Sequence, residues 1–524
     1  MIHGVGSKWW SNATLYQIYV RSWKDSNGDG VGDFRGLIEN FNHIVELGVD
    51  GVWLSPINPS PNKDYGYDVS DYVGINPEYG TIEDFKELIA LFNENSLKLI
   101  MDLVPNHTSS QHRWFIEANK SSDNVYRDYY VWSSGREGGS KPPNNWIDAT
   151  GASAWTFDEK SGQYFLHNFL VDQPDLNWWN LKVQQEFEDI LKFWFDLGVD
   201  GFRIDVAHGI FKDAELRDDP PAQGGELGAT YGNLPVYSAN RPEVHGLYKS
   251  WRAIAEEYKP ERLLLGETWV NDPAALVKFF GDDDELQLTF NFGFVMTKFS
   301  ARGMHDAVHL ALSEQPLASI ATWTGSNHDI SRFPTRWCGD DEDTIRLALV
   351  LLFTLPGVVV LYYGDEIGTV DADISREQMV DTMSLDSTKN VFLRDRARTP
   401  LHWSDAPGRG FSSAVRTWLP SVDAPFGSVA AQRDDVESIL NLTKKLTRLH
   451  KEIDGKAKLK DVFIDESRWI YEVDQFLVDL VFEKSDSSET ISDKFTMSDF
   501  DEVLSSERLT SSGAKAKATI YRRR

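Results

Sequence analysis

The 524-residue sequence contains a single cysteine, Cys338, so no disulfide can form within the chain and an oxidising compartment is not required. No apolar stretch reaches the roughly 18 residues that a bilayer crossing needs. Residues 347–361 come closest, but Pro356 and Gly357 divide them into a predicted helix and a predicted strand. A charged segment followed by an apolar run is also lacking near residue 1, so no signal peptide is evident. These features predict a cytoplasmic protein without membrane contact.

Positive charge is also scarce, because the chain has 53 Lys and Arg residues but 81 Asp and Glu residues, and its net charge is −28. Nucleic-acid partners are disfavoured, since the phosphate backbone is bound by clustered Lys and Arg. Anionic membranes and strongly acidic substrates are disfavoured for the same reason, and a small neutral substrate fits best. The 18 Trp suit stacking on sugar rings, although a large core uses Trp too. We expect a monomer or a small homo-oligomer of two or three domains per chain.

Eight short apolar runs alternate with amphipathic helical stretches. Near-continuous apolar runs are typical of parallel strands that are buried on both faces. Helical spacing of apolar residues appears between them, for example over 34–45 and 82–92. Eight strands alternating with helices predict an α/β protein built on a (β/α)₈ barrel. The runs are residues 15–20, 51–55, 98–104, 201–206, 262–267, 287–292, 319–324 and 358–363.

Two segments depart from a plain barrel. Residues 105–176 are too long for an ordinary loop and predict a subdomain inserted after the third strand. Beyond a predicted last helix over 434–451, short strands are expected at 462–464, 469–473, 476–482 and 519–521, which indicates a C-terminal antiparallel β domain. The predicted division is therefore a barrel over 1–104 and 177–452, an inserted subdomain over 105–176 and a β domain over 453–524.

Acidic or histidine side chains follow most of the predicted strands. Catalytic groups of this barrel lie at the carboxyl ends of its strands, and ionised groups beside apolar residues are unfavourable unless they are paired or functional. Retaining glycoside hydrolysis uses two carboxyl groups about 5–5.5 Å apart, one as nucleophile and one as acid. A structural ion pair is the alternative for any single group. The side chains are Asp102, Arg203, Asp205, Glu267, His328, Asp329, Asp365 and Glu366.

The fourth and fifth strands carry the most informative pair. Arg203 precedes Asp205 by two residues, so both side chains project from the same face of the strand. We expect the guanidinium to keep that carboxylate ionised and oriented. Glu267 is flanked by an apolar run and by Trp269, and such surroundings favour the protonated form that a general acid needs.

Four short motifs, in order, resemble the signature regions of glycoside hydrolase family 13, the α-amylase family. They are DLVPNH (102–107), GFRIDVAH (201–208), GET (266–268) and NHD (327–329), and the likeness extends from Trp9 to about His450. QPDLN (173–177) resembles the α-glucosidase and oligo-1,6-glucosidase branch. The resemblance implies a retaining, exo-acting α-glucosidase that releases α-linked glucose from the non-reducing end of short oligosaccharides or disaccharides.

The resemblance also implies catalytic roles for three carboxyl groups. Asp205 would be the nucleophile that forms a covalent glucosyl-enzyme, and Glu267 would be the general acid and base. Asp329 would hold sugar hydroxyls and distort the ring toward the transition state. Three further residues are implied to bind the same glucose unit, namely His107, Arg203 and His328. For the two histidines, the alternative is a buried ring whose hydrogen bonds are made within the protein.

Further substrate-binding residues follow from motifs typical of exo-acting members. DYGYD after the second strand and RTPLHW after the eighth imply an ion pair between Asp64 and Arg398 that closes the pocket behind one glucose. Tyr67 would stack on the sugar face, and Gln173 would contribute on the acceptor side. Val206, directly after Asp205, resembles members that accept α-1,6 bonds, but α-1,4 bonds stay open as well.

The segment DSNGDGVGD (25–33) spaces oxygen ligands at alternate positions, as the first part of an EF-hand loop does. The twelfth position is Gly36 rather than the bidentate Glu, so a calcium sensor is excluded. Similar α-glucosidases imply a structural Ca²⁺ here, with Mg²⁺ as the alternative ion and no organic cofactor. A solvated acidic turn is the other interpretation. The predicted ligands are Asp25, Asn27, Asp29, the carbonyl of Val31, and Asp33.

Two other functions compete with hydrolysis. A glucosyl-transferring isomerase of the trehalose synthase or sucrose isomerase type would keep the same covalent step and transfer the glucose to a trapped sugar. The segment ISRFPTRW after Asp329 shows no isomerase signature. A non-catalytic scaffold of this fold typically loses one of the three carboxyl groups, and all three are present here.

Overall fold

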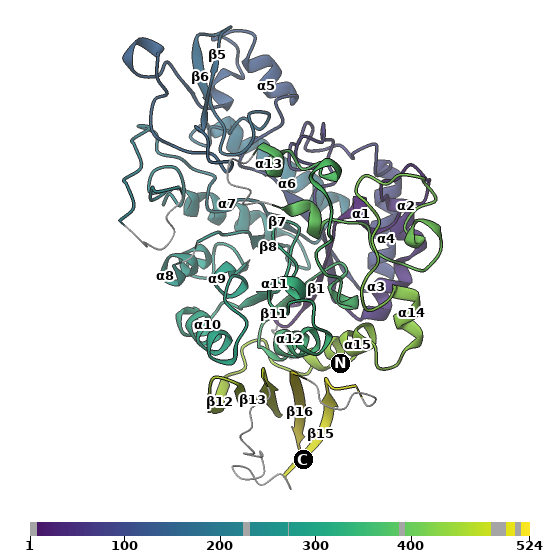
Figure 1. Cartoon of the computed structure of the whole chain (residues 1–524). Coiled ribbons are helices and arrows are strands. Elements are labelled where there is room, and N and C mark those ends of the chain that lie inside the picture. Colours follow the sequence, from purple (N-terminus) through teal and green to yellow (C-terminus); the bar gives the residue numbers. More distant parts are fainter. Residues whose placement is uncertain (1–7, 224–230, 271, 387–392, 484–498, 509–514) are drawn as a thin grey trace.

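The structure is a computed structural model that describes residues 8–524 except 224–230, 271, 387–392, 484–498 and 509–514 (Figure 1). Eight parallel strands form a nearly closed barrel in the order β10-β11-β1-β2-β3-β7-β8-β9. Each predicted apolar run overlaps one of them, which confirms the fold class. The strands are β1 (Thr14–Ile18), β2 (Gly51–Leu54), β3 (Lys98–Leu103), β7 (Gly201–Ile204), β8 (Leu263–Gly266), β9 (Leu288–Thr289), β10 (Thr322–Thr324) and β11 (Val358–Tyr362).

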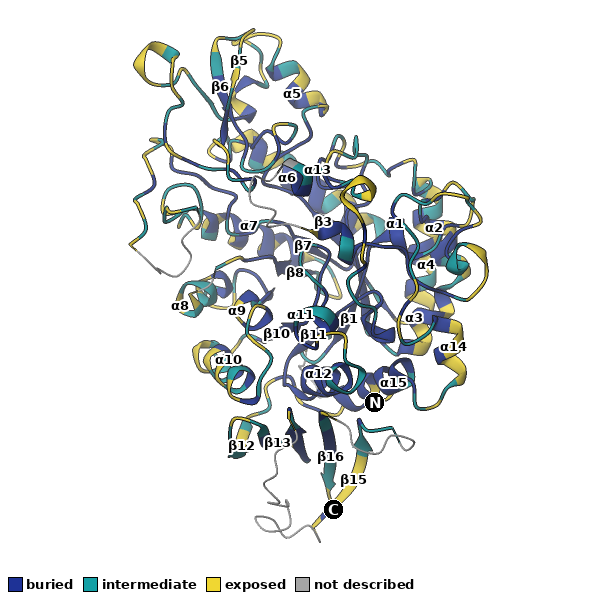
Figure 2. Ribbon diagram, in the orientation of Figure 1, coloured by how far each residue is buried: buried dark blue, intermediate teal, exposed yellow. Residues whose placement is uncertain are grey.

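Helices surround the barrel and bury their apolar faces against it, while their outer faces are exposed (Figure 2). The long ones are α4 (Ile82–Glu94), α6 (Leu181–Leu197), α7 (Val244–Glu257), α10 (Ala301–Glu314), α12 (Glu342–Thr354) and α15 (Ile439–His450). The short helices, of which α5 belongs to the segment inserted after β3, are α1 (Val20–Trp23), α2 (Phe34–Glu39), α3 (Phe41–Leu47), α5 (Arg113–Ala118), α8 (Pro273–Leu276), α9 (Phe292–Val295), α11 (Phe333–Arg336), α13 (Thr382–Asp386) and α14 (Val429–Asp434).

Local sequence explains where several helices begin and end. A capping box of Thr81 and Asp84 starts α4, because each side chain accepts a backbone N–H of the other residue. The predicted helix over 34–45 is divided at Asn40 into α2 and α3. The expected break after α12 is present, since Gly357 has a φ of 123°, which favours glycine. Every residue of α12 from Ile345 to Thr354 is buried, because the helix lies between the barrel and the C-terminal sheet.

The insertion after β3 forms a small antiparallel sheet in the order β4-β6-β5. Its strands are β4 (Trp132–Ser133), β5 (Trp155–Asp158) and β6 (Gln163–Leu166), and they lie at the top of Figure 1. Trp146, Trp155 and Leu166 belong to a core of its own. This subdomain stands over the carboxyl ends of the barrel strands and so adjoins the site described below.

The C-terminal segment is a five-stranded antiparallel sheet in the order β12-β13-β14-β16-β15. Its strands are β12 (Leu459–Ile464), β13 (Arg468–Val473), β14 (Phe476–Val481), β15 (Phe500–Ser505) and β16 (Lys517–Arg523). Four of them were predicted, whereas β15 was not, because its sequence FDEVLS carries charges typical of an exposed edge strand. Over the described residues, no helix combines the length and apolar character that crossing a membrane would require.

Candidate active site

A cavity of about 790 Å³ opens at the carboxyl ends of the barrel strands. Such an end is where this fold places its functional side chains. The predicted residues at its wall are Asp64, Tyr67, His107, Asp205, Val206, Glu267 and Asp329. The other predicted residues of the site, Gln173, Arg203, His328 and Arg398, have essentially no exposed surface and contact these wall residues from behind.

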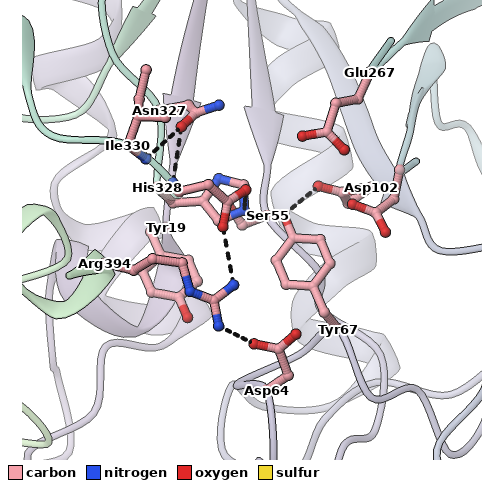
Figure 3. A network of polar contacts seen from close by, with 12 residues as sticks. Tyr19, Ser55, Asp64, Tyr67, Asp102, Glu267, Asn327, His328, Ile330 and Arg394 are labelled. Carbon is pink, nitrogen blue, oxygen red and sulfur yellow. Dashed lines mark hydrogen bonds and ion pairs between the residues drawn. The ribbon is translucent and has the colours of Figure 1, made fainter. Parts of the chain in front are cut away.

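Three carboxyl groups share the guanidinium of Arg203 at the base of this cavity. The register of β3 and β7 sets Asp102 opposite Arg203, and Nη1 lies 2.8 Å from Asp102 Oδ1 and 2.8 Å from Asp205 Oδ1. Nη2 of the same group lies 2.7 Å from Glu267 Oε1. Asp102 also accepts a hydrogen bond from the hydroxyl of Tyr67 at 2.9 Å (Figure 3). The two predicted catalytic carboxyl groups are therefore held beside each other by one cation.

Burial and the charge of Arg203 act in opposite directions on the pKa values of this cluster. Burial raises the pKa of Asp205 well above its ordinary value, and Arg203 opposes this shift without cancelling it. Burial likewise raises the pKa of Asp102 to about 7 against the pull of Arg203. Arg203 lowers the pKa of Asp205, as expected, but its single positive charge is divided among three buried carboxyl groups. The protons of the cluster are therefore released in coupled steps.

The Asp102→Asn variant is expected to extend activity to lower pH. The negative charge of Asp102 contributes to the raised pKa of Asp205, so its removal lowers that pKa and the ionised nucleophile persists in more acidic solution. The acidic limb of kcat/KM against pH should move down by about one unit, at a reduced maximal rate. Asp365→Asn is the matched control, because Asp365 is equally buried with a pKa near 7 but pairs with Arg332 away from the cavity wall. An unmoved or upward-shifted limb in Asp102→Asn would contradict this account.

Asp329 has the opposite electrostatic setting. Its Oδ1 lies 3.1 Å from Arg394 Nη1 and 3.0 Å from Arg398 Nη2, and its Oδ2 lies 3.0 Å from His328 Nε2. Burial alone would raise the pKa of Asp329, but His328 and the two arginines lower it below its ordinary value. Because burial also lowers the pKa of His328 well below its usual range, that ring is neutral at pH 7 and the arginines supply the positive charge. Asp329 is thus ionised and accepts hydrogen bonds only.

The ion pair that the sequence suggested between Asp64 and Arg398 is wrong. Arg394 takes that place, with Nη2 at 2.6 Å from Asp64 Oδ1 (Figure 3), and it also pairs with Asp381. Arg398 is turned away because its Nε donates to the carbonyl of His328 at 2.7 Å. A short 3₁₀ helix, Arg394–Ala397, separates the two arginines. Arg394 therefore bridges Asp64 and Asp329 across the end of the cavity.

Gln173 and His107 support the same end of the cavity. The amide nitrogen of Gln173 donates to Asp64 Oδ2 at 3.0 Å and lies 3.0 Å from His107 Nε2. His107 Nε2 also lies 2.9 Å from the carbonyl oxygen of Tyr67. Burial lowers the pKa of His107, so its ring is neutral at pH 7. The ring of Tyr67 stacks on that of His328, with centroids 5.0 Å apart. These predicted residues thus form one connected group around Asp64.

Glu267 is oriented by two donors besides Arg203. The backbone N–H of Val206 donates to Glu267 Oε2 at 3.0 Å, and the indole of Trp269 donates to Oε1 at 3.2 Å. Val206 reaches this position with a φ of 47°, a left-handed conformation that is strained for a β-branched residue. Strained backbone of this kind clusters at functional sites. The residue that follows Asp205 therefore positions Glu267 through its main chain.

Much of the remaining cavity wall comes from residues that were not predicted individually from the sequence. The inserted subdomain contributes residues 147–149 and Phe169 to the cavity wall. The segment after β7 contributes several residues between 233 and 240. Met383 and Arg394 also line the cavity. No apolar periodicity or motif pointed to these residues, although Arg394 stands only four positions before the RTPLHW motif.

The predicted metal ligands lie in the loop before α2, outside the cavity wall. Asp25 accepts the backbone N–H groups of Gly28 and Gly30 at 2.7 and 2.8 Å, and Asp33 caps α2 by accepting the N–H of Gly36 at 2.6 Å. Asp25 and Asp33 are buried, whereas Asn27 and Asp29 are exposed. All five predicted ligand atoms, including the carbonyl of Val31, are oxygen. This donor chemistry fits a hard cation such as Ca²⁺.

Fold and cavity together define a (β/α)₈ barrel with an acidic site at the strand ends. The family model described as "Alpha amylase, catalytic domain" matches residues 17–457, and the chain belongs to the alpha-amylase family. The alpha-glucosidase of Apis mellifera is 38% identical over 83% of this chain and 78% of that protein. The oligo-1,6-glucosidase of Parageobacillus thermoglucosidasius is 36% identical over 88% of this chain and 87% of that protein. The crystal structure of the alpha-glucosyl transfer enzyme XgtA covers 99% of this chain and 100% of its own, with a TM-score of 0.89 and 31% identity.

Proposed function

We propose that this protein is a retaining, exo-acting α-glucosidase that hydrolyses α-linked glucose from the non-reducing end of short oligosaccharides or disaccharides. The observation that carries the proposal is the pair of carboxyl groups, Asp205 and Glu267, held by one guanidinium in a cavity whose end is bridged by Arg394. The relatives named alpha-glucosidase and oligo-1,6-glucosidase support the substrate class. The substrate is a small neutral glucoside.

Asp205 and Glu267 would act in two steps. Asp205 attacks the anomeric carbon while Glu267 gives its proton to the glycosidic oxygen, so the bond to the leaving sugar breaks and a glucosyl-enzyme forms. Glu267, now ionised, takes a proton from water, and the water oxygen displaces Asp205 with net retention. The backbone N–H of Val206 and the indole of Trp269 fix the carboxyl group of Glu267 for both transfers.

Asp329 and Arg394 would account for exo action. The ionised Asp329 accepts hydrogen bonds from sugar hydroxyls, and such bonds strengthen as positive charge develops on the ring. The bridge from Asp64 through Arg394 to Asp329 crosses the cavity where a preceding sugar unit would have to lie. A terminal glucose fits behind this bridge, whereas an internal unit of a long chain would clash with it.

A panel of kcat/KM values tests the proposed substrate class. Maltose, isomaltose, sucrose, trehalose and longer maltooligosaccharides are compared by the release of free glucose. We expect net glucose from at least one α-glucoside, short substrates to exceed long ones, and the first glucose released to be the α-anomer. Absence of glucose from all of them, or release of the β-anomer, would overturn the proposal.

Glucosyl transfer is the second candidate, because the structural relative XgtA is described as an alpha-glucosyl transfer enzyme. An isomerase of the trehalose synthase or sucrose isomerase type would pass the glucosyl unit to the trapped second sugar rather than to water. The same incubations separate the two functions. Hydrolysis depletes the disaccharide pool, whereas isomerisation keeps its size constant and changes its composition.

We further propose a structural Ca²⁺ in the loop of Asp25 and Asp33, with Mg²⁺ as the alternative ion. Bound Ca²⁺ would supply only rigidity, since the loop lies outside the cavity wall. Removal of the ion with a chelator is expected to lower the melting temperature by several degrees and Ca²⁺ should restore it, because a ligand that binds only the folded chain stabilises it. Unchanged melting together with no bound ion would refute the site. Cytoplasmic location and a monomeric or small homo-oligomeric state stay predictions.

A further inference from the structure

Two histidines of α10 face the C-terminal sheet on the side of the barrel remote from the cavity (Figure 1). His305 and His309 are four residues apart, so they lie on the same face of the helix. Their ring centroids are 4.4 Å apart. A histidine pair at this spacing presents two nitrogen atoms to one point, as helical metal sites do.

Asp461 of β12 completes the group from the opposite domain. Its Oδ2 lies 3.1 Å from His305 Nε2 and 3.0 Å from His309 Nε2. The three ligand atoms all lie within 4.8 Å of one another. The register of β12 against β13 shifts between Asp461 and Phe463, and an irregularity of this kind re-aims a side chain.

Neighbouring groups already orient these side chains as a metal site requires. His305 Nδ1 lies 2.7 Å from Asp306 Oδ1, and in the tautomer that donates Nδ1–H to this carboxylate the lone pair of Nε2 points at Asp461 and His309. Asp461 Oδ1 accepts the indole N–H of Trp469 at 2.9 Å, so Oδ2 is left for the histidines. Trp469 is fully buried and packs edge-on against His305, which excludes water from that side.

Protein contacts alone leave this arrangement incompletely satisfied. In that tautomer of His305 the ring has no N–H left for Asp461, although Nε2 lies 3.1 Å from Oδ2. The Nε2 atom of His309 is buried and makes no hydrogen bond to any residue that the structure describes, although Asp461 is close. A cation between the three atoms would bind both imidazole lone pairs and the carboxylate at once.

We propose that His305, His309 and Asp461 bind a divalent transition-metal ion, with Zn²⁺ as the best fit, at the junction of the barrel and the C-terminal sheet. Two imidazoles and one carboxylate suit Zn²⁺, which takes three protein ligands and a water in tetrahedral sites. Ligand atoms about 2.0–2.1 Å from such an ion lie about 3.3 Å apart. The observed separations from Asp461 Oδ2, 3.1 and 3.0 Å, require only small shifts. The ion would fasten α10 to β12.

Zinc binding to the full chain, stripped of metal with a chelator and dialysed, tests the proposal. Bound zinc per chain is measured by elemental analysis and affinity by titration calorimetry with Zn²⁺ alone. We expect the His305→Gln/His309→Gln variant to hold one zinc fewer per chain than the wild type. We also expect Asp461→Asn to weaken binding at least tenfold. Comparing stoichiometries separates this site from any zinc held by other carboxyl groups.

His245→Gln is the matched control. His245 also lies on a barrel helix and pairs with a carboxylate, Glu285, at 2.7 Å, but it has no part in this group. This variant should bind zinc as the wild type does. Equal zinc content in the wild type and the double variant would overturn the proposal, as would a wild-type affinity weaker than about 1 mM.

Two further measurements guard against misfolding and against confusion with the cavity. His309→Gln changes the more exposed histidine alone and should weaken zinc binding at least tenfold, with an unchanged circular-dichroism spectrum. Tetrahedral Co²⁺ should give visible absorption bands in the wild type that the double variant lacks. Hydrolysis of a chromogenic α-glucoside should be equal in both, since none of these residues lines the cavity. Failure of the zinc site would therefore leave the proposed function untouched.

Discussion

The Asp205→Asn variant is expected to hydrolyse a chromogenic α-glucoside about 10⁴-fold more slowly than the wild type, or slower still. An amide is a far weaker nucleophile than a carboxylate, so the covalent glucosyl-enzyme would not form. The amide is also neutral and leaves Arg203 with two carboxyl partners, Asp102 and Glu267, so the fold should tolerate the change. The loss should appear in the single-turnover rate constant, which isolates the chemical step from product release.

Asp200→Asn provides the control for this experiment. Asp200 directly precedes β7, the same strand that carries Asp205, but lies at its amino end and pairs with Lys98 at 2.9 Å and Arg262 at 3.0 Å. Its replacement should lower stability and leave kcat nearly unchanged. If Asp205→Asn kept a rate comparable to that of Asp200→Asn, the assignment of the nucleophile would be lost.

Replacing Arg394 by Ala is expected to lower kcat/KM for maltose by about 10²-fold or more, because the substrate-facing carboxylate Asp329 loses one of its two cations. Asp64 and Asp381 would lose a buried partner as well, which destabilises the fold by about 3–5 kcal/mol. Since the bridge across the cavity end is removed, the preference for short over long maltooligosaccharides should also fall. Substrate preference and thermal stability are measured on the same variant.

Two other arginine variants separate position from charge. Arg394→Lys retains a positive charge but cannot reach Asp64, Asp329 and Asp381 together, so an intermediate loss is expected. Arg332→Lys alters another buried arginine, which lies outside the cavity wall and donates to the carbonyl of Tyr363 at 2.7 Å. It should reduce stability without changing the ratio of short to long substrates. If Arg394→Ala left the ratio of activity on short and long substrates unchanged, the bridge would not be the cause of exo action.

Apolar runs were enough to predict all eight barrel strands, because a strand buried on both faces must be apolar along its length. β9 is only two residues long, and its run was still apparent in the sequence. β15 escaped prediction because an exposed edge strand needs neither apolar character nor alternation. Burial on both faces therefore explains why the barrel strands could be predicted from the sequence.

Strand ends and family motifs were enough to predict most of the functional residues, while several of their pairings could not be predicted. Arg394 and Arg398 are both near the eighth strand, and only the path of the 3₁₀ helix between them decides which one meets Asp64. The protonation of Asp205 depends on how many buried carboxyl groups Arg203 serves, which is a property of three strands together. Likewise His305 and Asp461 are 156 positions apart, and no sequence pattern indicated that they meet.

The cavity has two kinds of wall with different structural origins. Asp205 and Glu267 follow directly from barrel strands whose removal would unfold the chain, whereas Phe169 belongs to the inserted subdomain and residues 233–240 belong to a connecting segment. Substitutions in the second group touch neither the barrel core nor the reacting carboxyl groups. The preference for the sugar on the leaving side of the glycosidic bond can therefore change in evolution, or be altered by directed mutagenesis. Bond cleavage and folding would be preserved.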